Sequence, residues 1–147
     1  MSFVMMIPGA FSAFRGCALY AGGARYNLAG TNFDSIWDGA CNAILSITRT
    51  AQGRYTVALN KNWPREMVFG MAALHEAQGF VTNNKRARIV RDSYDASAGT
   101  FVIEVIATDD DAATLAVPTL VDPADNDLLE FFCVFQMHDS QVESHGS

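Results

Sequence analysis

The segment from residue 43 to residue 60, AILSITRTAQGRYTVALN, constrains the fold more than any other part of the chain. Apolar residues alternate with mostly polar ones in both of its halves: Ala43, Leu45 and Ile47, then Tyr55, Val57 and Leu59. Because successive side chains of a strand point to opposite faces, each half is predicted to be a strand with one apolar face. Gly53 lies in the short break at 50–53, where a turn needs a residue with positive φ. The segment therefore predicts a β-hairpin.

Two later segments have the composition of buried strands. Residues 100–108, TFVIEVIAT, are mostly apolar on both faces, which predicts a central strand of a sheet. Residues 128–138, LLEFFCVFQMH, are predicted to form the last strand. Its core-facing residues are expected to be Leu129, Phe131, Cys133, Phe135 and Met137. Phe132 and Val134 fall on the opposite face, where apolar side chains need a cover.

The segments between these strands are less regular. Residues 17–28 are either two strands around Gly22 and Gly23 or one bulged strand. Residues 62–79 have the capping residues of a helix, but a strand over 67–76 is favoured because its neighbours on both sides look like strands. The remaining segments are predicted as a short strand at 87–91, turns at 29–39 and 92–99, and a long loop at 109–127.

Short strands joined by glycine, asparagine, aspartate and proline turns predict an all-β fold, an antiparallel β-sandwich of the jelly-roll-like kind. The length of 147 residues favours one domain. We expect an apolar N-terminal arm at 1–16, the sandwich domain at 17–138 and a polar C-terminal tail at 139–147. The residues predicted to be buried together are Leu45, Ile47, Tyr55, Val57, Leu59, Phe101, Ile103, Val105, Phe131, Cys133 and Phe135.

The charge of the chain argues against nucleic acid and anionic membranes as partners. Its 16 acidic and 10 basic residues give a formal charge of −6, which repels polyanions. No apolar stretch approaches the length of a membrane span. The basic residues near the predicted strand at 87–91 are interpreted as its solvated side rather than as a phosphate track: Lys85, Arg86, Arg88 and Arg91.

The cysteine pattern indicates reduced thiols. Cys17, Cys41 and Cys133 are odd in number and far apart, so they form no disulfide framework. They are expected to be free thiols of a protein made in a reducing cytoplasm. Cys133 shares its predicted strand face with apolar residues, and a buried cysteine of this kind is unreactive.

No set of residues in the sequence has the spacing of a catalytic or metal site. His75, His138 and His145 belong to no metal-ligand pattern, and the aspartates at 109–111 do not form a calcium loop. Neither a nucleophile motif nor a phosphate-binding loop is present. Glu104 and Glu130 lie on predicted strands and are expected to face solvent or a neighbouring subunit. We therefore predict a protein that is not an enzyme and takes no cofactor.

The segment 46–64, SITRTAQGRYTVALNKNWP, resembles a motif of virion proteins of tailed bacteriophages. The shared features are a strand ending in Thr-Arg-Thr, a short glycine turn, Tyr-Thr-Val-x-Leu and a loop with Trp-Pro. The continuation is also similar, with a strand containing Ile89 and Val90, then Thr-Phe-x-Ile, a loop with proline and a final aromatic strand. The resemblance covers about the last two-thirds of the chain and is to small capsid decoration or cement proteins.

This resemblance implies a virion structural protein, made in the host cytoplasm, that binds the major capsid protein at the capsid surface and stabilises the phage head. It also implies self-association as a homodimer or homotrimer. The residues expected at the subunit or capsid contact are Phe3, Val4, Met5, Met6, Ile7, Phe11, Phe14, Phe132 and Val134. For the N-terminal arm, packing into its own core is the alternative to such a contact.

A second hypothesis is a tail or head-fibre module that binds a host receptor or a glycan. Such a module needs exposed aromatic side chains on its loops, and Trp37, Trp63 and Tyr94 are the candidates. The alternative role of these three residues is packing beneath a loop.

Overall fold

The computed structural model of the chain describes residues 17–37, 44–60, 64–77, 84–108 and 118–136. These residues form nine strands and no helix, so this part of the chain contains no helix that could span a membrane. The strands are β1 Cys17–Asn27, β2 Asn32–Trp37, β3 Ile44–Ala51, β4 Arg54–Leu59, β5 Glu66–His75, β6 Asn84–Ile89, β7 Thr100–Thr108, β8 Thr119–Leu120 and β9 Leu128–Gln136. The all-β prediction is confirmed. The arm at 1–16 and the tail at 139–147 lie outside the described residues.

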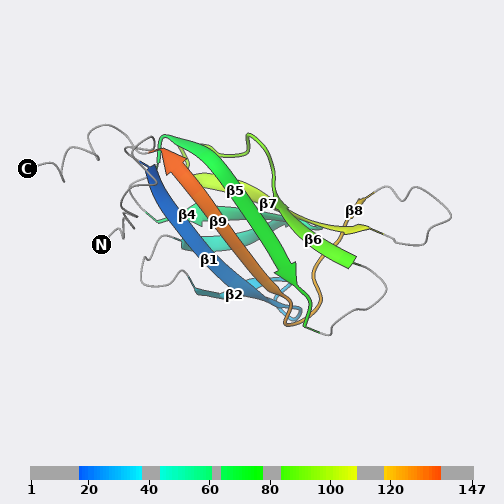
Figure 1. Cartoon of the computed structure of the whole chain (residues 1–147). Helices are drawn as coiled ribbons and strands as arrows, with labels where there is room; N and C mark the ends of the chain where they lie inside the picture. The colour runs from blue at the N-terminus through cyan, green and yellow to red at the C-terminus, as the bar shows by residue number, and fades with distance from the viewer. Residues whose placement is uncertain (1–16, 38–43, 61–63, 78–83, 109–117, 137–147) are drawn as a thin grey trace, which may run out of the picture.

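The strands form two antiparallel sheets that pack against each other as a sandwich (Figure 1). The first sheet has the order β2-β1-β9-β5, and the second has the order β3-β4-β7-β6, with β8 added to β7. The chain changes sheet between β2 and β3, between β4 and β5, between β5 and β6, and between β8 and β9. The first and last described strands, β1 and β9, are paired at the centre of the first sheet.

The predicted hairpin is formed by β3 and β4. Gly53 has a φ of 65° in the connection between them. A Cβ atom there would lie 2.7 Å from the carbonyl oxygen of Val105 and 2.7 Å from the amide nitrogen of Val121. Glycine is therefore required both by the backbone conformation and by the close approach of two other backbone segments.

The strand pairing decides between the alternatives that the sequence leaves open for residues 17–28 and 62–79. Residues 17–27 form one strand whose register with β2 shifts between Gly23 and Arg25, in agreement with the single-bulged-strand alternative. The strand favoured over 67–76 is confirmed as β5. The predicted turn at 29–39 is wrong in part, because residues 32–37 form the strand β2. The asparagine and aspartate of β2 are tolerated because it is an edge strand paired only with β1.

The core between the sheets contains all of the predicted buried residues except Leu45. The register of β3 with β4 shifts between Ile44 and Ser46, so the alternation of side chains is interrupted at Leu45. As a result Ile44 and Ile47 point into the core, whereas Leu45 is 64% exposed. Aromatic rings of both sheets meet edge to face inside the sandwich, as in the contact of Phe101 with Phe131 at a centroid distance of 5.8 Å.

Candidate interaction surface

The outer face of the β2-β1-β9-β5 sheet carries an uninterrupted group of apolar side chains. Because Phe131, Cys133 and Phe135 point inward, the intervening residues of β9 point outward. The cross-strand pairs then place outward residues of three strands in two adjacent rows. One row is Ala21, Phe132 and Met71, and the next is Leu19, Val134 and Phe69. We call these six residues the apolar band.

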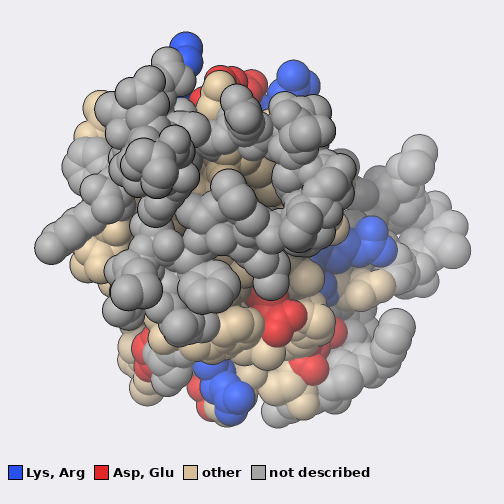
Figure 2. Space-filling model, turned by 60° about the vertical axis from the view of Figure 1, so that its left-hand side comes forward, with Lys and Arg blue, Asp and Glu red and all other residues tan. Residues whose placement is uncertain are grey.

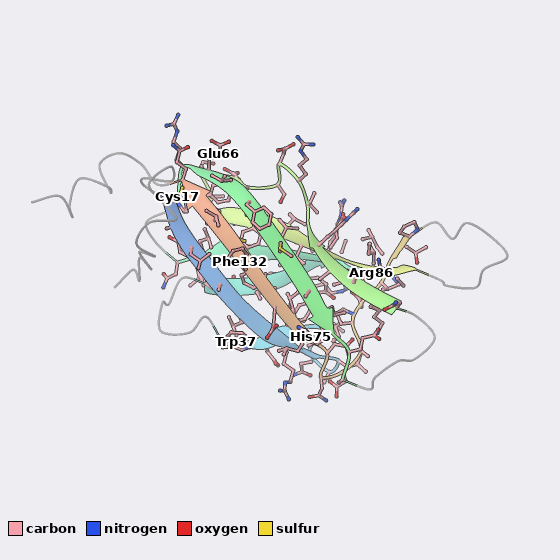
Figure 3. All side chains as sticks on the ribbon, viewed as in Figure 1. Cys17, Trp37, Glu66, His75, Arg86 and Phe132 are labelled. Atoms are coloured by element: carbon pink, nitrogen blue, oxygen red, sulfur yellow. The ribbon has the colours of Figure 1, made fainter. Side chains whose placement is uncertain are left out.

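Several side chains of the apolar band are accessible to solvent. Phe69 is 49% exposed, Met71 is 59% exposed and Phe132 is 37% exposed. The rings of Phe69 and Phe132 pack edge to face at a centroid distance of 6.0 Å. Figure 3 shows Phe132 near the middle of the sheet. A contiguous exposed apolar surface of this kind is a candidate interaction site.

Trp37 extends the apolar surface at the β2 edge of the same sheet (Figure 3). Its indole lies against Gly23, where an added Cβ atom would approach the ring to 2.7 Å. Almost half of the side chain, 47%, remains exposed. Of the three aromatic residues considered for receptor binding, Tyr94 instead packs on Phe135 and donates a hydrogen bond to the carbonyl oxygen of Pro64 at 2.6 Å. Trp63 lies outside the described residues.

Polar residues border the apolar band at both ends. At one end Glu66 of β5 is paired with Gln136, which is paired in turn with Cys17 of β1. At the other end Nε2 of His75 lies 2.9 Å from Oε2 of Glu130, and both side chains are partly exposed. On the face shown in Figure 2, charged side chains of both signs are scattered over the described surface. The band is therefore an apolar stripe with charged ends.

The outer face of the β3-β4-β7-β6 sheet is polar and satisfied by its own side chains. Glu104 at its centre accepts hydrogen bonds from Arg54 on one side, at 2.8 Å, and from Arg88 on the other, at 2.8 Å. Burial alone would raise the pKa of Glu104, but the two guanidinium groups outweigh it and hold the pKa below its usual range. The prediction that Glu104 faces solvent or a subunit is wrong, because the arginines cover the carboxylate and leave it 3% exposed.

The basic cluster near β6 divides between the two faces of the strand. Arg86 and Arg88 are exposed on the outer side, and Arg91 is exposed beyond the strand, as the solvated-strand interpretation predicts. Lys85 differs, because its register on β6 points it inward, where its Nζ lies 3.5 Å from Oδ2 of Asp127. The cluster is therefore not a continuous phosphate track.

Asp122 joins the β3–β4 hairpin to the loop that precedes β9. Its carboxylate accepts two hydrogen bonds from Arg49, at 3.0 and 2.7 Å, one from the amide of Gly53 at 2.9 Å and one from the hydroxyl of Tyr55 at 2.8 Å. These bonds, led by those from Arg49, lower the pKa of Asp122 to about 2. Burial and the bond to Asp122 raise the pKa of Tyr55. The sequence predicts only a turn residue here, because nothing local indicates Arg49 as its partner.

Asp127 holds the turns at the same end of the sandwich. It is 1% exposed and accepts hydrogen bonds from the amides of Ala124 at 2.7 Å and Ala77 at 3.0 Å. Asp127 therefore acts as a turn residue within the segment predicted as a long loop. Asp122 and Asp127 thus have structural partners, and neither is directed at a ligand.

The described residues contain no group of three or more histidine, cysteine, aspartate or glutamate side chains that could hold a metal ion. Cys17 and Cys133 are free thiols, and burial raises the pKa of Cys133 to about 12, so that it stays protonated. Other residues of the sequence predictions lie outside the described residues: Cys41, His138, His145, Met137 and the aspartates at 109–111. The same holds for the predicted contact residues Phe3, Val4, Met5, Met6, Ile7, Phe11 and Phe14.

Comparison of the chain with protein-family models, curated proteins and solved structures gave no match. The two remaining predicted contact residues, Phe132 and Val134, both lie in the apolar band. Sequence reasoning found these two from the parity of β9 but missed Phe69 and Met71, and it considered Trp37 only as a candidate for receptor binding. The sequence shows which residues of β5 share a face, but it does not show that β9 is the neighbouring strand.

Proposed function

We propose that this protein is a non-enzymatic virion structural protein of a tailed bacteriophage, which binds the major capsid protein and stabilises the head as a decoration or cement protein. The observation that carries the proposal is the apolar band, which occupies a sheet face that a soluble sandwich would otherwise cover with polar side chains. The resemblance of segment 46–64 to phage virion proteins supports the same class.

The energetics of such a surface suit a repeating shell. Completing the burial of a half-exposed side chain such as Phe69 or Met71 contributes about 1 kcal/mol, so one copy of the band supplies modest affinity. A capsid presents the complementary surface in many symmetric copies, and an oligomeric ligand multiplies the contacts. Binding to the assembled shell but not to its free subunits would stabilise the shell by linkage.

Co-sedimentation with shells assembled from the major capsid protein of the same virus tests the proposal. Wild-type protein is expected in the pellet, and Phe132→Ser is expected to remain largely in the supernatant. Leu45→Ser is the control, because Leu45 is an exposed apolar residue on the other sheet. Circular dichroism should show that both variants are folded. Wild-type protein that stays in the supernatant, or equal binding by the two variants, would contradict the proposal.

A second candidate is a tail or head-fibre module that binds a host receptor or glycan. It is favoured by Trp37, because an exposed indole on a rigid strand suits stacking against a sugar ring. Glycan-array binding that Trp37→Ala abolishes, together with recovery of the protein on purified tails rather than heads, would decide for this alternative. Retention on heads by Trp37→Ala would decide against it.

A further inference from the structure

Four described strands longer than two residues lie at the edges of the sheets, and they differ in how well they are protected from pairing with another chain. Edge strands of soluble proteins are usually short, charged or bulged, because an unpaired edge can add a further strand. β2 is six residues long and contains Asp34. β3 contains Arg49 and has two register shifts against β4. β6 is six residues long and contains Lys85, Arg86 and Arg88.

β5 lacks most of this protection. It is ten residues long, and no charged residue lies between Glu66 at its start and His75 at its end. One edge pairs with β9 along the whole strand, and no described strand pairs with the other edge. Its one irregularity is the register shift between Met67 and Phe69. β5 is therefore the described edge best suited to accept another strand.

We infer that β5 pairs with β5 of a second copy of this chain, in antiparallel register about a two-fold axis at Met71. The inference makes specific the self-association that the resemblance to decoration proteins implies, and it rests on the proposed function only for its use in a capsid contact. Pairing of two equal edges gives a closed, symmetric dimer. It would join the two sheets into one continuous sheet with four strands from each copy.

The pattern of outward residues on β5 fixes this register. Because Val68 is the extra residue at the register shift, the outward residues follow the order Glu66, Phe69, Met71, Ala73 and His75. This order is symmetric about Met71, so that Phe69 faces Ala73 of the second copy and the inward residues also face inward ones. Any shift of register that keeps the faces aligned leaves fewer residues paired.

Charge complementarity supports the same register. With Met71 at the axis, Glu66 of each copy lies opposite His75 of the other, so both ends of the new strand pair join an acidic residue to a histidine. In between, only uncharged side chains meet. The two apolar bands then lie on the same side of the joined sheet, which doubles the apolar surface available for a capsid contact.

The first test is the mass of the purified protein in solution, measured by analytical ultracentrifugation as a function of concentration. Wild-type protein should be a dimer or a multiple of one. Met71→Lys and Met71→Glu should each weaken dimerisation at least about tenfold, because like charges then face each other across the axis. A mixture of the two variants should restore the dimer. A monomeric wild-type protein, or a mixture no more associated than its components, overturns the inference.

The second test distinguishes edge pairing from stacking of two apolar bands face to face. In edge pairing, residues at the axis have Cα atoms about 5 Å apart, close enough for a disulfide, whereas packed sheets are about 10 Å apart. In a background with Cys17 and Cys41 replaced by serine, Met71→Cys should form a covalent dimer on oxidation. Phe132→Cys, one strand further from the axis, should not. Equal cross-linking of the two variants, or none, overturns the inference.

Both tests use the protein alone, without shells, so their results do not depend on whether the proposed function is correct. Formation of the Met71→Cys cross-link, together with wild-type protein that does not bind shells, would support the β5 pairing and remove the capsid proposal. A wild-type monomer that binds shells would exclude the β5 pairing and support the capsid proposal.

Discussion

The outer faces of the two sheets occupy equivalent positions in the sandwich but differ in chemistry. At the centre of the β3-β4-β7-β6 sheet, Glu104 is covered by two arginines of neighbouring strands. At the centre of the β2-β1-β9-β5 sheet, Phe132 lies among Met71, Phe69 and Ala21, and remains partly exposed. The centre of the polar face has its counter-charges within one chain, because the Glu104 carboxylate pairs with both Arg54 and Arg88. The apolar face has no such ion cluster among the described residues, and it is the face that we propose is buried against another molecule.

The largest expected effect contrasts the inner and outer faces of one strand. Phe131→Ala should lower the free energy of unfolding by about 3–5 kcal/mol, because it leaves a cavity between the sheets next to Phe101. Phe132→Ala, one residue further along β9, should cost only about 1 kcal/mol because its ring is partly exposed. Urea unfolding measures both. Similar losses in the two variants would mean that the outer face is also part of a core.

The next prediction compares the loss of stability when one carboxylate on each outer face is replaced by an amide. Glu104→Gln should destabilise the protein by about 2 kcal/mol, because two charge-assisted hydrogen bonds are weakened and two arginines are left facing each other. Glu130→Gln on the other sheet should cost less than about 1 kcal/mol, because its pair with His75 is exposed. The urea midpoint at pH 7 is the measurement. Equal shifts would contradict the view that the polar face is stabilised by its central ion cluster.

A smaller effect is expected in the pH dependence of stability. It concerns Asp122, in the loop between β8 and β9. The pKa of Asp122 in the folded protein is about 2, below the value of about 3.9 expected in the unfolded chain. Its contribution is therefore present above about pH 4 and is lost as the pH falls toward 2. Melting temperatures of wild type and Asp122→Asn should differ at pH 6 and converge near pH 2. A difference that stays constant with pH would exclude the ionised carboxylate as its source.

The smallest effect concerns the thiols on the two faces of the first sheet. Cys133 points inward and its pKa is raised to about 12, whereas Cys17 is only half-buried. Adding a reductant to fresh protein should leave the melting temperature unchanged. Under native conditions a thiol reagent should modify Cys17 well before Cys133, as peptide mass spectrometry would show. Rapid labelling of Cys133 would mean that the inner face opens readily.

The fold class follows from the sequence because strand alternation and turn residues are local signals. Both β4 and β9 show an unbroken alternation, and their inward residues were predicted correctly. The errors occur where a strand departs from alternation or depends on distant residues. Leu45 was placed inside because a bulge is not visible in the sequence of one strand. Glu104 was placed in solvent because its two arginines come from separate strands.

The candidate surface was less predictable than the fold for a related reason. The sequence identifies Phe132 and Val134 as apolar residues on the face of β9 that points away from the core. The rest of the apolar band comes from β1 and β5, which lie on either side of β9. Those neighbours are fixed by the strand order, which no local pattern specifies. The seven predicted contact residues of the N-terminal arm lie outside the described residues and stay a prediction.

The pairing of β1 with β9 has a consequence for how the protein is made. Cys17 is paired with Gln136, so the first described strand needs the last one as its neighbour. During synthesis β1 and β2 leave the ribosome long before β9 exists, and the centre of their sheet stays vacant until β9 has been made. Folds that depend on such distant pairs form slowly and expose unpaired strands meanwhile. The sandwich should therefore close only after β9 has emerged, and until then the apolar edge of β5 is exposed to other nascent chains.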